Sequence, residues 1–394
     1  MRVAYVSMDP GVPAFGVKGC SVHVQEGLRA LARHGLRPAL FTARLGGPPP
    51  ADLAHVPVHA LPCLPEAAPD VRERATLSAN TALAAHLPEH EPFDLIYERY
   101  ALWSFAAMEH GRAAGLPTVL EVNAPLIDEQ AQHRHLVDVD GATAASRRAF
   151  AAADALIAVS EGVADWLDGF AEARGRIHVV PNGVDADRVR PGLDPAWTAS
   201  DGTFVIGFVG SLKPWHGLSV LAEAFARLHR AAPEARLLLV GDGPEREPLT
   251  AQLHDLGVQD AVQFAGAVPP NEVPRWLAAI NVAVAPYADA TACYFSPLKI
   301  FEYMAAGRAI VASRVGQVAE VLDHEATALL VEAGAAKALA EALDRLRCDP
   351  LLRLRLGTTA RATVLMRHTW TAVFQHVLAL VGLAAMPDNQ REAA

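Results

Sequence analysis

The chain has 394 residues, of which 52% are hydrophobic and 20% charged, and its formal net charge at pH 7 is -10. This length predicts two or three domains, and this composition argues for large buried cores and against intrinsic disorder. The acidic balance argues against binding of a DNA or RNA backbone as the main function, because that requires a basic surface. An anionic ligand would therefore have to be bound locally.

The cysteines and the N-terminus favour an intracellular protein. Cys20, Cys63, Cys293 and Cys348 are far apart in sequence, which gives no spacing for a zinc site or a disulfide framework. Residues 1–7 become polar too quickly for a secretory signal, and no apolar run approaches the roughly 18 residues of a membrane span. We expect a soluble, cytoplasmic protein without a transmembrane segment, and peripheral membrane contact stays open.

The first half alternates short β-branched runs with helical patterns, which predicts a parallel sheet covered by helices on both faces. The expected strands are 2–7, 37–42, 94–98, 117–122, 154–159 and 176–180. The clearest helix begins near Ser21 and ends at Gly35, where a left-handed C-cap is expected. A long helical pattern covers 126–152.

The pattern breaks after 181–185, because turn residues lead into 191–195, a segment with two prolines and no periodicity. We place the domain boundary between 190 and 191. A second series of strands is expected at 203–209, 235–240, 262–264, 281–285, 309–312 and 327–331. Helices follow these strands, most clearly at 218–230, and a final helix over 370–383 has no strand after it.

These elements predict an α/β protein with two Rossmann-like domains, 1–190 and 191–369, followed by a helix and tail at 370–394. Open α/β sheets bind ligands beyond the carboxyl ends of their strands. Two facing domains therefore make the cleft between them the expected site.

The segment 296–307 is the most informative motif in the chain. Ser296 can serve as the N-cap of a helix and Pro297 as its first residue, which leaves the amides of Leu298 and Lys299 free to face a diphosphate. The segment therefore predicts a helix that begins at an anion-binding site.

The same helix is expected to have two different faces. Lys299, Glu302 and Tyr303 fall on one face of a helical wheel. The opposite face is apolar and consists of Ile300, Phe301, Met304 and Ala305. We expect the first face to meet a ligand and the second to be buried; an ordinary amphipathic helix with a good cap is the alternative.

Two loops follow the first two strands of the second series. Residues 210–217 occupy the position of a phosphate-binding loop, although no Gly-Lys-Ser/Thr closes it as in a Walker loop. Its Lys213 and His216 are candidates to supply positive charge to a departing diphosphate, and a βα turn with incidental polar residues is the alternative. Residues 241–244 are interpreted mainly as a tight turn, since Arg246 replaces the third glycine of a dinucleotide fingerprint.

Polar residues also follow strands in the first half. The glycines in 16–21 either let the backbone approach a ligand closely or are needed only because the backbone there adopts a positive φ. Asn123 and Glu129 are candidates for acceptor or donor-sugar contacts, and Glu129 has a second explanation as a charge that favours the first turn of a helix. His133 and His135 have no third ligand nearby, so we predict no metal there.

In their order and spacing, these motifs resemble the family 4 glycosyltransferases, which are retaining enzymes of the two-domain GT-B fold. The resemblance spans nearly the whole chain and rests on residues 16–21, 159–161, 181–185, 210–217, 241–244 and the helix with Glu302. It implies metal-independent transfer of a sugar, of hexosyl type, from a nucleotide diphosphate donor to an acceptor hydroxyl. The donor would be a UDP-sugar or GDP-sugar, with UDP preferred on family frequency, and no other cofactor is implied. The helix from Trp370 would cross back to the first domain.

The resemblance also assigns roles to residues. Glu302 would bind the donor ribose, the amides around Leu298 and Lys299 the diphosphate, and the backbone near Ala267 and Val268 the base. The other donor-binding residues are Gly210, Ser211, His216 and Ser296. Catalytic roles fall to Lys299, Lys213 and Asn123. Acceptor contacts fall to Lys18, Gly19 and Glu129.

Several positions depart from the family pattern. Tyr294 stands where the first of two glutamates is usual, and Ser211 and His216 stand where an arginine and a lysine are common. Lys213 or Lys299 is then expected to supply part of the positive charge that the arginine and the lysine usually provide. Asn123 stands where the family often has a histidine. Together, these departures resemble a subgroup of the family in which the helix starts with Ser-Pro-Leu-Lys.

Two other kinds of function stay open from the sequence. A sugar-nucleotide epimerase of similar fold would convert the donor without an acceptor, and a phosphorylase would carry a cofactor-bearing lysine. A non-catalytic nucleotide-sugar-binding module is motivated by Tyr294, Ser211 and His216. The acceptor is open among an amino sugar, a small-molecule natural product, a glycan and a lipid carrier.

Overall fold

The structure of the protein, a computed structural model, describes residues 1–61, 67–133, 135–289 and 294–383. The chain divides into two compact units: the first contains Met1–Pro181 and the segment from Trp370, and the second contains Asn182–Thr369. The division thus falls before Asn182, and not between 190 and 191 as the sequence suggested. Cys63 and Cys293 lie outside the described residues, and Cys20 and Cys348 are free thiols.

The first unit contains a seven-stranded parallel sheet with the order β3-β2-β1-β4-β5-β6-β7. Its strands are β1 (Arg2–Ser7), β2 (Arg37–Thr42), β3 (Val58–Ala60), β4 (Leu95–Arg99), β5 (Thr118–Val122), β6 (Ala155–Ala158) and β7 (Ile177–Val179). All strands expected from the sequence are present. The edge strand β3 was missed because its three residues form no apolar run.

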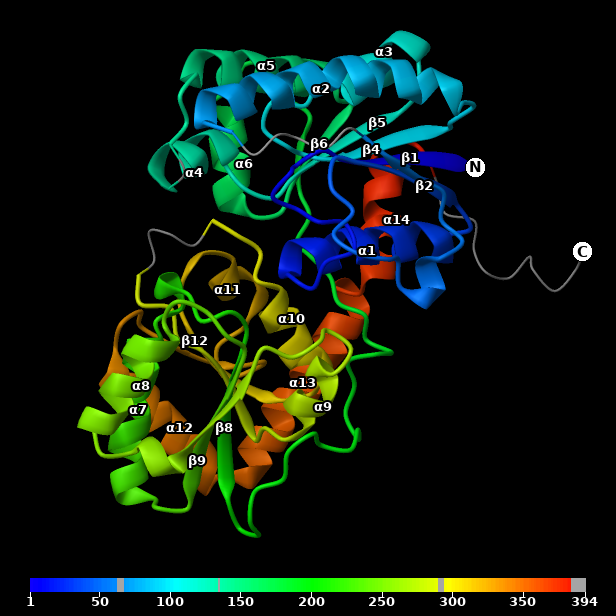
Figure 1. Cartoon of the computed structure of the whole chain (residues 1–394). Helices are drawn as coiled ribbons and strands as arrows, with labels where there is room; N and C mark the ends of the chain where they lie inside the picture. Colours follow the sequence, from blue (N-terminus) through cyan, green and yellow to red (C-terminus); the bar gives the residue numbers. More distant parts are fainter. Residues whose placement is uncertain (62–66, 134, 290–293, 384–394) are drawn as a thin grey trace, which may run out of the picture. The chain divides into compact units, whose positions relative to one another are not determined.

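Helices cover both faces of this sheet (Figure 1). One face carries α2 (Pro69–Glu89), α3 (Ala106–Ala114) and α5 (Val139–Ala152), and the other carries α1 (Gly19–Arg33) packed against α14 (Trp370–Leu380). The remaining helices are α4 (Leu126–His133) and α6 (Glu161–Asp168). The single helix expected over 126–152 is wrong: α4 ends, and the Asp138 side chain accepts a hydrogen bond from the Gly141 N–H to start α5 anew.

The second unit contains a six-stranded parallel sheet with the order β10-β9-β8-β11-β12-β13. Its strands are β8 (Phe204–Val209), β9 (Ala235–Val240), β10 (Val262–Gly266), β11 (Val282–Ala285), β12 (Ala309–Ser313) and β13 (Leu329–Val331). Its helices are α7 (Leu218–Ala231), α8 (Arg246–Asp255), α9 (Val273–Ala278), α10 (Leu298–Ala305), α11 (Gly316–Val321), α12 (Ala336–Cys348) and α13 (Pro350–Arg367). Short 3₁₀ turns cover Ala51–Leu53, Pro214–His216 and Gln259–Ala261.

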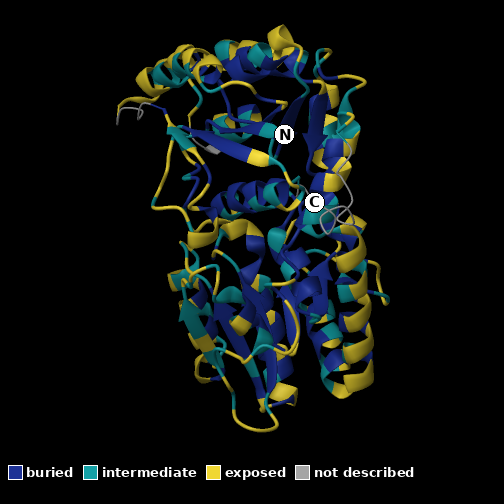
Figure 2. Ribbon diagram, turned by 90° about the vertical axis from the view of Figure 1, so that its right-hand side faces the viewer, coloured by how far each residue is buried: buried dark blue, intermediate teal, exposed yellow. Residues whose placement is uncertain are grey.

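Both faces of the second sheet are buried. Phe204, Ile206 and Phe208 of β8 point into a core shared with α7, α8 and α12. Val205 and Val209 point into the opposite core, shared with α10 and α13. Burial on both faces explains why these strands have continuous apolar runs in the sequence. Figure 2 shows these buried strands between helices whose outer faces are exposed.

The strand order places the loops that carry the candidate residues. Each sheet reverses its order at its centre, between β1 and β4 in the first unit and between β8 and β11 in the second. Open α/β sheets bind ligands beyond the carboxyl ends of the strands at such a reversal. The loop after β1 and the loop after β8 are therefore favoured positions for ligands. Within the described part of the chain, the helices are too short or too polar to cross a bilayer.

Candidate functional site

Backbone hydrogen bonds join the loops that follow β8, β9 and β10. The Gly210 N–H donates to the carbonyl that ends β9 at 2.9 Å, and the Leu212 N–H donates to the Asp242 carbonyl at 3.0 Å. The Gly241 N–H donates to the Gly266 carbonyl at 2.8 Å. Three loops therefore form one continuous backbone surface at the carboxyl end of the sheet. Ala267 and Val268, expected near the base, follow Gly266 directly on this surface.

Glycine is required where these loops approach one another. Gly210 and Gly241 have φ angles of 145° and 134°, which residues with side chains rarely adopt. A Cβ atom on Gly241 would lie 1.9 Å from the Gly210 carbonyl oxygen, and one on Gly217 would lie 1.7 Å from the Pro286 carbonyl oxygen. The segment 241–244 is thus a tight turn packed against the first loop, as the sequence indicated.

The start of α10 differs from the capping expected from the sequence. The helix begins at Leu298 with Pro297 in the capping position, and Ser296 is not the N-cap. Instead, the Ser296 hydroxyl oxygen accepts a hydrogen bond from the Asn182 N–H at 3.0 Å, and the Ser296 carbonyl accepts one from the Asn182 side-chain amide at 2.9 Å. The helix start is thereby tied to the beginning of the unit, and the amides of Leu298 and Lys299 have no acceptor within the helix.

Lys299 provides a buried positive charge beside the Gly210 turn. Lys299 is only 9% exposed, and its Nζ lies 4.2 Å from the centroid of the Phe208 ring. If Gly210 carried a Cβ atom, that atom would lie only 3.1 Å from the Lys299 Nζ, so the ammonium lies directly against the turn. Among the described residues it has no hydrogen-bond acceptor. A buried ammonium without an acceptor is costly, and an anion bound at the turn would supply the missing partner.

Burial controls the protonation of Lys299. Desolvation lowers the pKa of the ammonium from 10.5 to about 7, although the charge of Glu302 acts in the opposite direction. Glu302 is half-buried and lies one turn further along α10. The site therefore holds an ammonium that is readily deprotonated when no anion is bound.

The prediction that Tyr303 faces a ligand is wrong. Tyr303 is fully buried, and its hydroxyl accepts a hydrogen bond from the Val209 N–H at 2.9 Å and donates to the Val209 carbonyl at 3.3 Å. A helical wheel gives directions around one helix only, and α10 packs beneath the strands on this side as well. The tyrosine instead attaches α10 to the end of β8, directly before Gly210.

The expected positive charge on His216 is also wrong. His216 is 7% exposed, and burial together with the charge of Lys299 lowers the pKa of its imidazole to about 3. Its Nδ1 lies 2.7 Å from the Ser211 carbonyl oxygen, which can only accept, so Nδ1 carries the proton of the neutral ring. His216 thus supports the fold of the loop and carries no charge near neutral pH.

The outer part of the same loop is accessible. Ser211 is exposed, Trp215 is 49% exposed, and Lys213 is half-buried with its Nζ 5.8 Å from the centroid of the Trp215 ring. Among the described residues, this surface therefore has two lysines, with Lys213 on the loop and Lys299 beneath it.

In the first unit, the loop after β1 is held from inside. The Gln25 side-chain amide donates to the carbonyls of Ala14 and Gly16 at 3.1 and 2.9 Å. Lys18 caps α1 with an extended backbone, and Gly19 is the first residue of the helix. Both Lys18 and Gly19 are exposed, so the expected acceptor residues are accessible on this unit.

A buried polar cluster at the end of β5 was not foreseen from the sequence. The Glu121 carboxylate accepts hydrogen bonds from the Tyr97 hydroxyl at 2.7 Å and from the Asn123 amide at 3.3 Å. Its other close neighbour is His23, whose Nε2 lies 2.8 Å from Oε1. Burial alone would raise the pKa of Glu121, but the close approach of His23 and the hydrogen bond from Tyr97 outweigh burial and lower that pKa.

A signal for this cluster was present in the sequence. Glu121 is the one charged residue of a strand whose residues are all buried, and a buried carboxylate requires partners. The cluster brings the predicted residue Asn123 against Glu121, and the Oδ1 atom of Asn123 has no partner among the described residues. Glu129 is half-buried on α4.

Two family models match the chain. The model for "Glycosyltransferase Family 4" matches residues 17–188, and the model for "Glycosyl transferases group 1" matches residues 203–349. The first match lies within the first unit except for its last residues, and the second lies within the second unit.

Proteins of similar sequence are named as glycosyltransferases. The chain is 28% identical to D-inositol 3-phosphate glycosyltransferase of Stackebrandtia nassauensis, over 97% of this chain and 91% of that protein. It is 33% identical to the protein of the same name in Corynebacterium jeikeium, and this alignment spans 56% of this chain and only 55% of that protein.

Solved structures share the fold. Sucrose-phosphate synthase from Thermosynechococcus elongatus has a TM-score of 0.73 at 22% identity, over 96% of this chain and 98% of that chain. HepE of Anabaena in complex with UDP-glucose has a TM-score of 0.71 at 20% identity, over 97% of this chain and 99% of that chain.

Proposed function

Because this chain belongs to the family 4 glycosyltransferases of the GT-B fold, we propose that it transfers a sugar from a nucleotide diphosphate to an acceptor hydroxyl with retention of configuration and without a metal ion. The donor we propose is a UDP-sugar, with a GDP-sugar as second choice. The complex of HepE with UDP-glucose supports a nucleotide-sugar donor, and the free Cys20 and Cys348 support a cytoplasmic location.

The observation that carries the proposal is the buried, unpartnered ammonium of Lys299 beside the Gly210 turn. A donor diphosphate at this turn would accept hydrogen bonds from Lys299 and from the amides of the first turn of α10. Lys213, on the loop, would add a second positive charge. These groups stabilise the charge that develops on the diphosphate as the sugar leaves.

The rest of the donor is assigned to the same surface. Glu302, one turn along α10, accepts hydrogen bonds from the ribose hydroxyls, and the backbone at Ala267 and Val268 meets the base. The continuous backbone surface formed by the loops after β8, β9 and β10 supports these assignments of the ribose and the base. Ser211 is exposed beside the phosphates, whereas His216 and Ser296 act by shaping the loop and the helix start.

The first unit supplies the acceptor contacts. Lys18 and Gly19 at the start of α1, with Glu129 on α4, are proposed to contact the acceptor, and Asn123 to contact the transferred sugar. Among the described residues, no group donates a hydrogen bond to the Oδ1 atom of Asn123. This oxygen can therefore accept one from a sugar hydroxyl, which supports the role. The D-inositol 3-phosphate glycosyltransferase relatives support a small polyhydroxylated acceptor, as in natural-product or glycan biosynthesis.

The proposed reaction needs no carboxylate base. The bond between the anomeric carbon and the diphosphate oxygen breaks, and the acceptor oxygen forms a bond to that carbon on the same face. The acceptor proton passes to the departing phosphate oxygen. Lys299 and the helix amides hold that oxygen in position during the transfer.

Variants of Glu302 and Lys299 test the proposal. Glu302→Ala is expected to weaken donor binding, measured by calorimetry with UDP and GDP, while Lys299→Met is expected to slow transfer by roughly 10²–10³-fold, measured as nucleotide release with a panel of polyol and glycan acceptors. Glu223→Ala and Lys337→Met, at exposed positions on α7 and α12, are the matched controls.

The outcomes separate the rival functions. Unchanged donor binding and transfer in both site variants would reject the assigned site. Conversion of the donor without any acceptor would favour an epimerase. Tight nucleotide binding with no turnover across the panel would favour a binding module without catalysis.

A further inference from the structure

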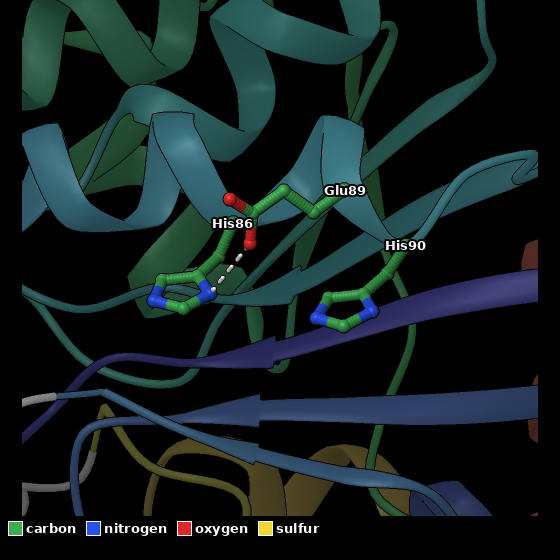
Figure 3. A group of neighbouring side chains, drawn as sticks. All are labelled: His86, Glu89 and His90. Atoms are coloured by element: carbon green, nitrogen blue, oxygen red, sulfur yellow. Dashed lines mark ion pairs between the residues drawn. The ribbon is translucent and has the colours of Figure 1, made fainter.

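Three metal-binding side chains meet at the end of α2, in the first unit. His86 and Glu89 belong to the last turn of the helix, and His90 is its C-cap residue. One ligand atom from each side chain lies within 4.8 Å of the other two. Figure 3 shows the imidazoles of His86 and His90 on the same side of the helix, with the Glu89 carboxylate reaching toward His86. No part of the proposed transfer uses these residues.

The spacing in the sequence produces this arrangement. Residues three and four positions apart lie on one face of a helix, so His86, Glu89 and His90 project together. The His86 Nδ1 and Glu89 Oε2 atoms are 3.4 Å apart. Two ligands of a tetrahedral zinc ion with bonds of about 2.0–2.1 Å are separated by about 3.4 Å. This pair is therefore already at the separation that one ion requires.

The third ligand is oriented by its neighbours. The His90 ring is stacked on the ring of His59 in edge strand β3, with centroids 3.8 Å apart, and His59 is stacked on Phe41 at 4.7 Å. Ring stacking limits the rotation of His90 much as a hydrogen bond limits a metal-bound histidine. His86 and Glu89 have side chains that are 43% and 64% exposed, so they have room to change rotamer and close around an ion.

Electrostatics at this position favour a cation. Carbonyl groups at the C-terminus of a helix carry a partial negative charge, and the Glu89 carboxylate adds a full one. The nearby Glu91 carboxylate lies 2.7 Å from the His110 Nε2 and is thus engaged by another group. Two imidazoles and one carboxylate form a ligand set that suits zinc and similar ions and does not suit magnesium.

We propose that His86, Glu89 and His90 bind a Zn²⁺ ion, with water in the remaining coordination position. The ion joins the last turn of α2 to its C-cap residue, and through the ring of His90 it stabilises the contact with β3. This site is separate from the sugar transfer proposed above, which uses no metal.

Titration of the full chain with ZnCl₂, after removal of any affinity tag, tests this site. Calorimetry is expected to give one Zn²⁺ per chain, with affinity at least tenfold weaker in His86→Ala and in His90→Ala. The melting temperature should rise with Zn²⁺ concentration in the wild type, because a ligand of the folded state stabilises it. MgCl₂ at the same concentrations should give no shift.

Matched histidine variants provide the control. His110→Ala removes an imidazole of the same unit that pairs with Glu91, and His254→Ala removes an exposed imidazole of the second unit. Both should bind one Zn²⁺ like the wild type. Zn²⁺ affinity that is unchanged in His86→Ala and His90→Ala, or binding without saturation at one ion per chain, would overturn the proposal. Melting temperatures without metal show whether each variant is folded.

Discussion

The Lys299 ammonium lies over the ring of Phe208, with Nζ 4.2 Å from the ring centroid. Phe208 belongs to β8 and Lys299 to α10, so this contact joins the strand before the Gly210 turn to the helix that faces it. The face of an aromatic ring attracts a cation, which offsets part of the cost of burying the charge. The ring does not replace a hydrogen-bond acceptor, so the ammonium keeps its capacity to bind an anion.

Donor binding is expected to take up a proton at Lys299. Its pKa is about 7 without an anion, so at pH 8 most of the side chain is neutral. A bound diphosphate favours the charged form and raises this pKa. Calorimetry with UDP in two buffers of different ionisation enthalpy should therefore show uptake of nearly one proton at pH 8 and much less at pH 6.

Lys299→Met should abolish this uptake, whereas Lys337→Met should leave it unchanged. In the protein without ligand, the folded pKa of Lys299 lies below its unfolded value of 10.5. The unfolded chain then binds more protons between about pH 7 and 10.5, so Lys299 makes stability rise with pH across this window. Equal proton uptake by the wild type and Lys299→Met would contradict the assignment.

His216→Phe is expected to destabilise the second unit at neutral pH but less so in acid. At pH 7.5 the variant loses the hydrogen bond to the Ser211 carbonyl, with an expected cost of about 1–3 kcal/mol. The folded pKa of His216, about 3, lies below the unfolded value of 6.5. The unfolded chain therefore binds more protons between these values, and wild-type stability falls as the pH drops.

The difference in melting temperature between wild type and His216→Phe should shrink from pH 7.5 to pH 5. His254→Gln, at an exposed imidazole, is the control and should show no such change. A difference that is constant or grows in acid would show that His216 titrates near its ordinary pKa.

Glu98→Gln is expected to stabilise the first unit above pH 7. Glu98 is fully buried, and burial raises the pKa of its carboxyl from 4.5 to about 7, although the hydrogen bond from Ser104 acts in the opposite direction. Because the folded pKa is the higher one, its contribution to stability is complete below pH 4.5 and is lost as the pH rises through 7. The neutral amide avoids this loss.

Thermal unfolding should give a higher melting temperature for Glu98→Gln than for the wild type at pH 8 and nearly the same value at pH 5. The expected gain at pH 8 is about 3 kcal/mol, from a pKa shift of this size. Glu109→Gln, at a partly exposed carboxylate paired with Arg148, is the matched control. A lower melting temperature for Glu98→Gln at pH 8 would refute the prediction.

Asn182→Ala is expected to weaken donor binding through the start of α10. The change removes the side-chain hydrogen bond to the Ser296 carbonyl, and Ser296→Ala removes the hydroxyl that accepts from the Asn182 N–H. Each loss should cost about 1–3 kcal/mol of stability, because both residues are buried.

A double-mutant cycle distinguishes a shared role from two separate ones. The two substitutions remove two different hydrogen bonds that hold the same pair of backbone segments together. If both bonds position one helix start, their effects on melting temperature and on UDP affinity should be non-additive, with a coupling of about 0.5–3 kcal/mol. Effects that simply add would show that the contact between Asn182 and Ser296 does not position the helix.

The sequence by itself determined every strand except the edge strand β3, most helices and the order of the loops. Apolar runs such as Phe204–Val209 predict a buried parallel strand because both faces of the sheet are covered. Gly210 and Lys299 were also identified from the sequence, because a turn after a strand and a lysine at a helix start are local features. The family expectation followed from these features and from their spacing.

Only the tertiary structure decided the partners and the charges. Ser296 bonds to Asn182, and Glu121 lies against His23, although each pair is far apart in the chain. His216 is neutral because groups from other segments bury it and because Lys299 lies nearby. Desolvation and hydrogen bonding depend on neighbours brought together by folding, and no local pattern in a sequence contains those neighbours.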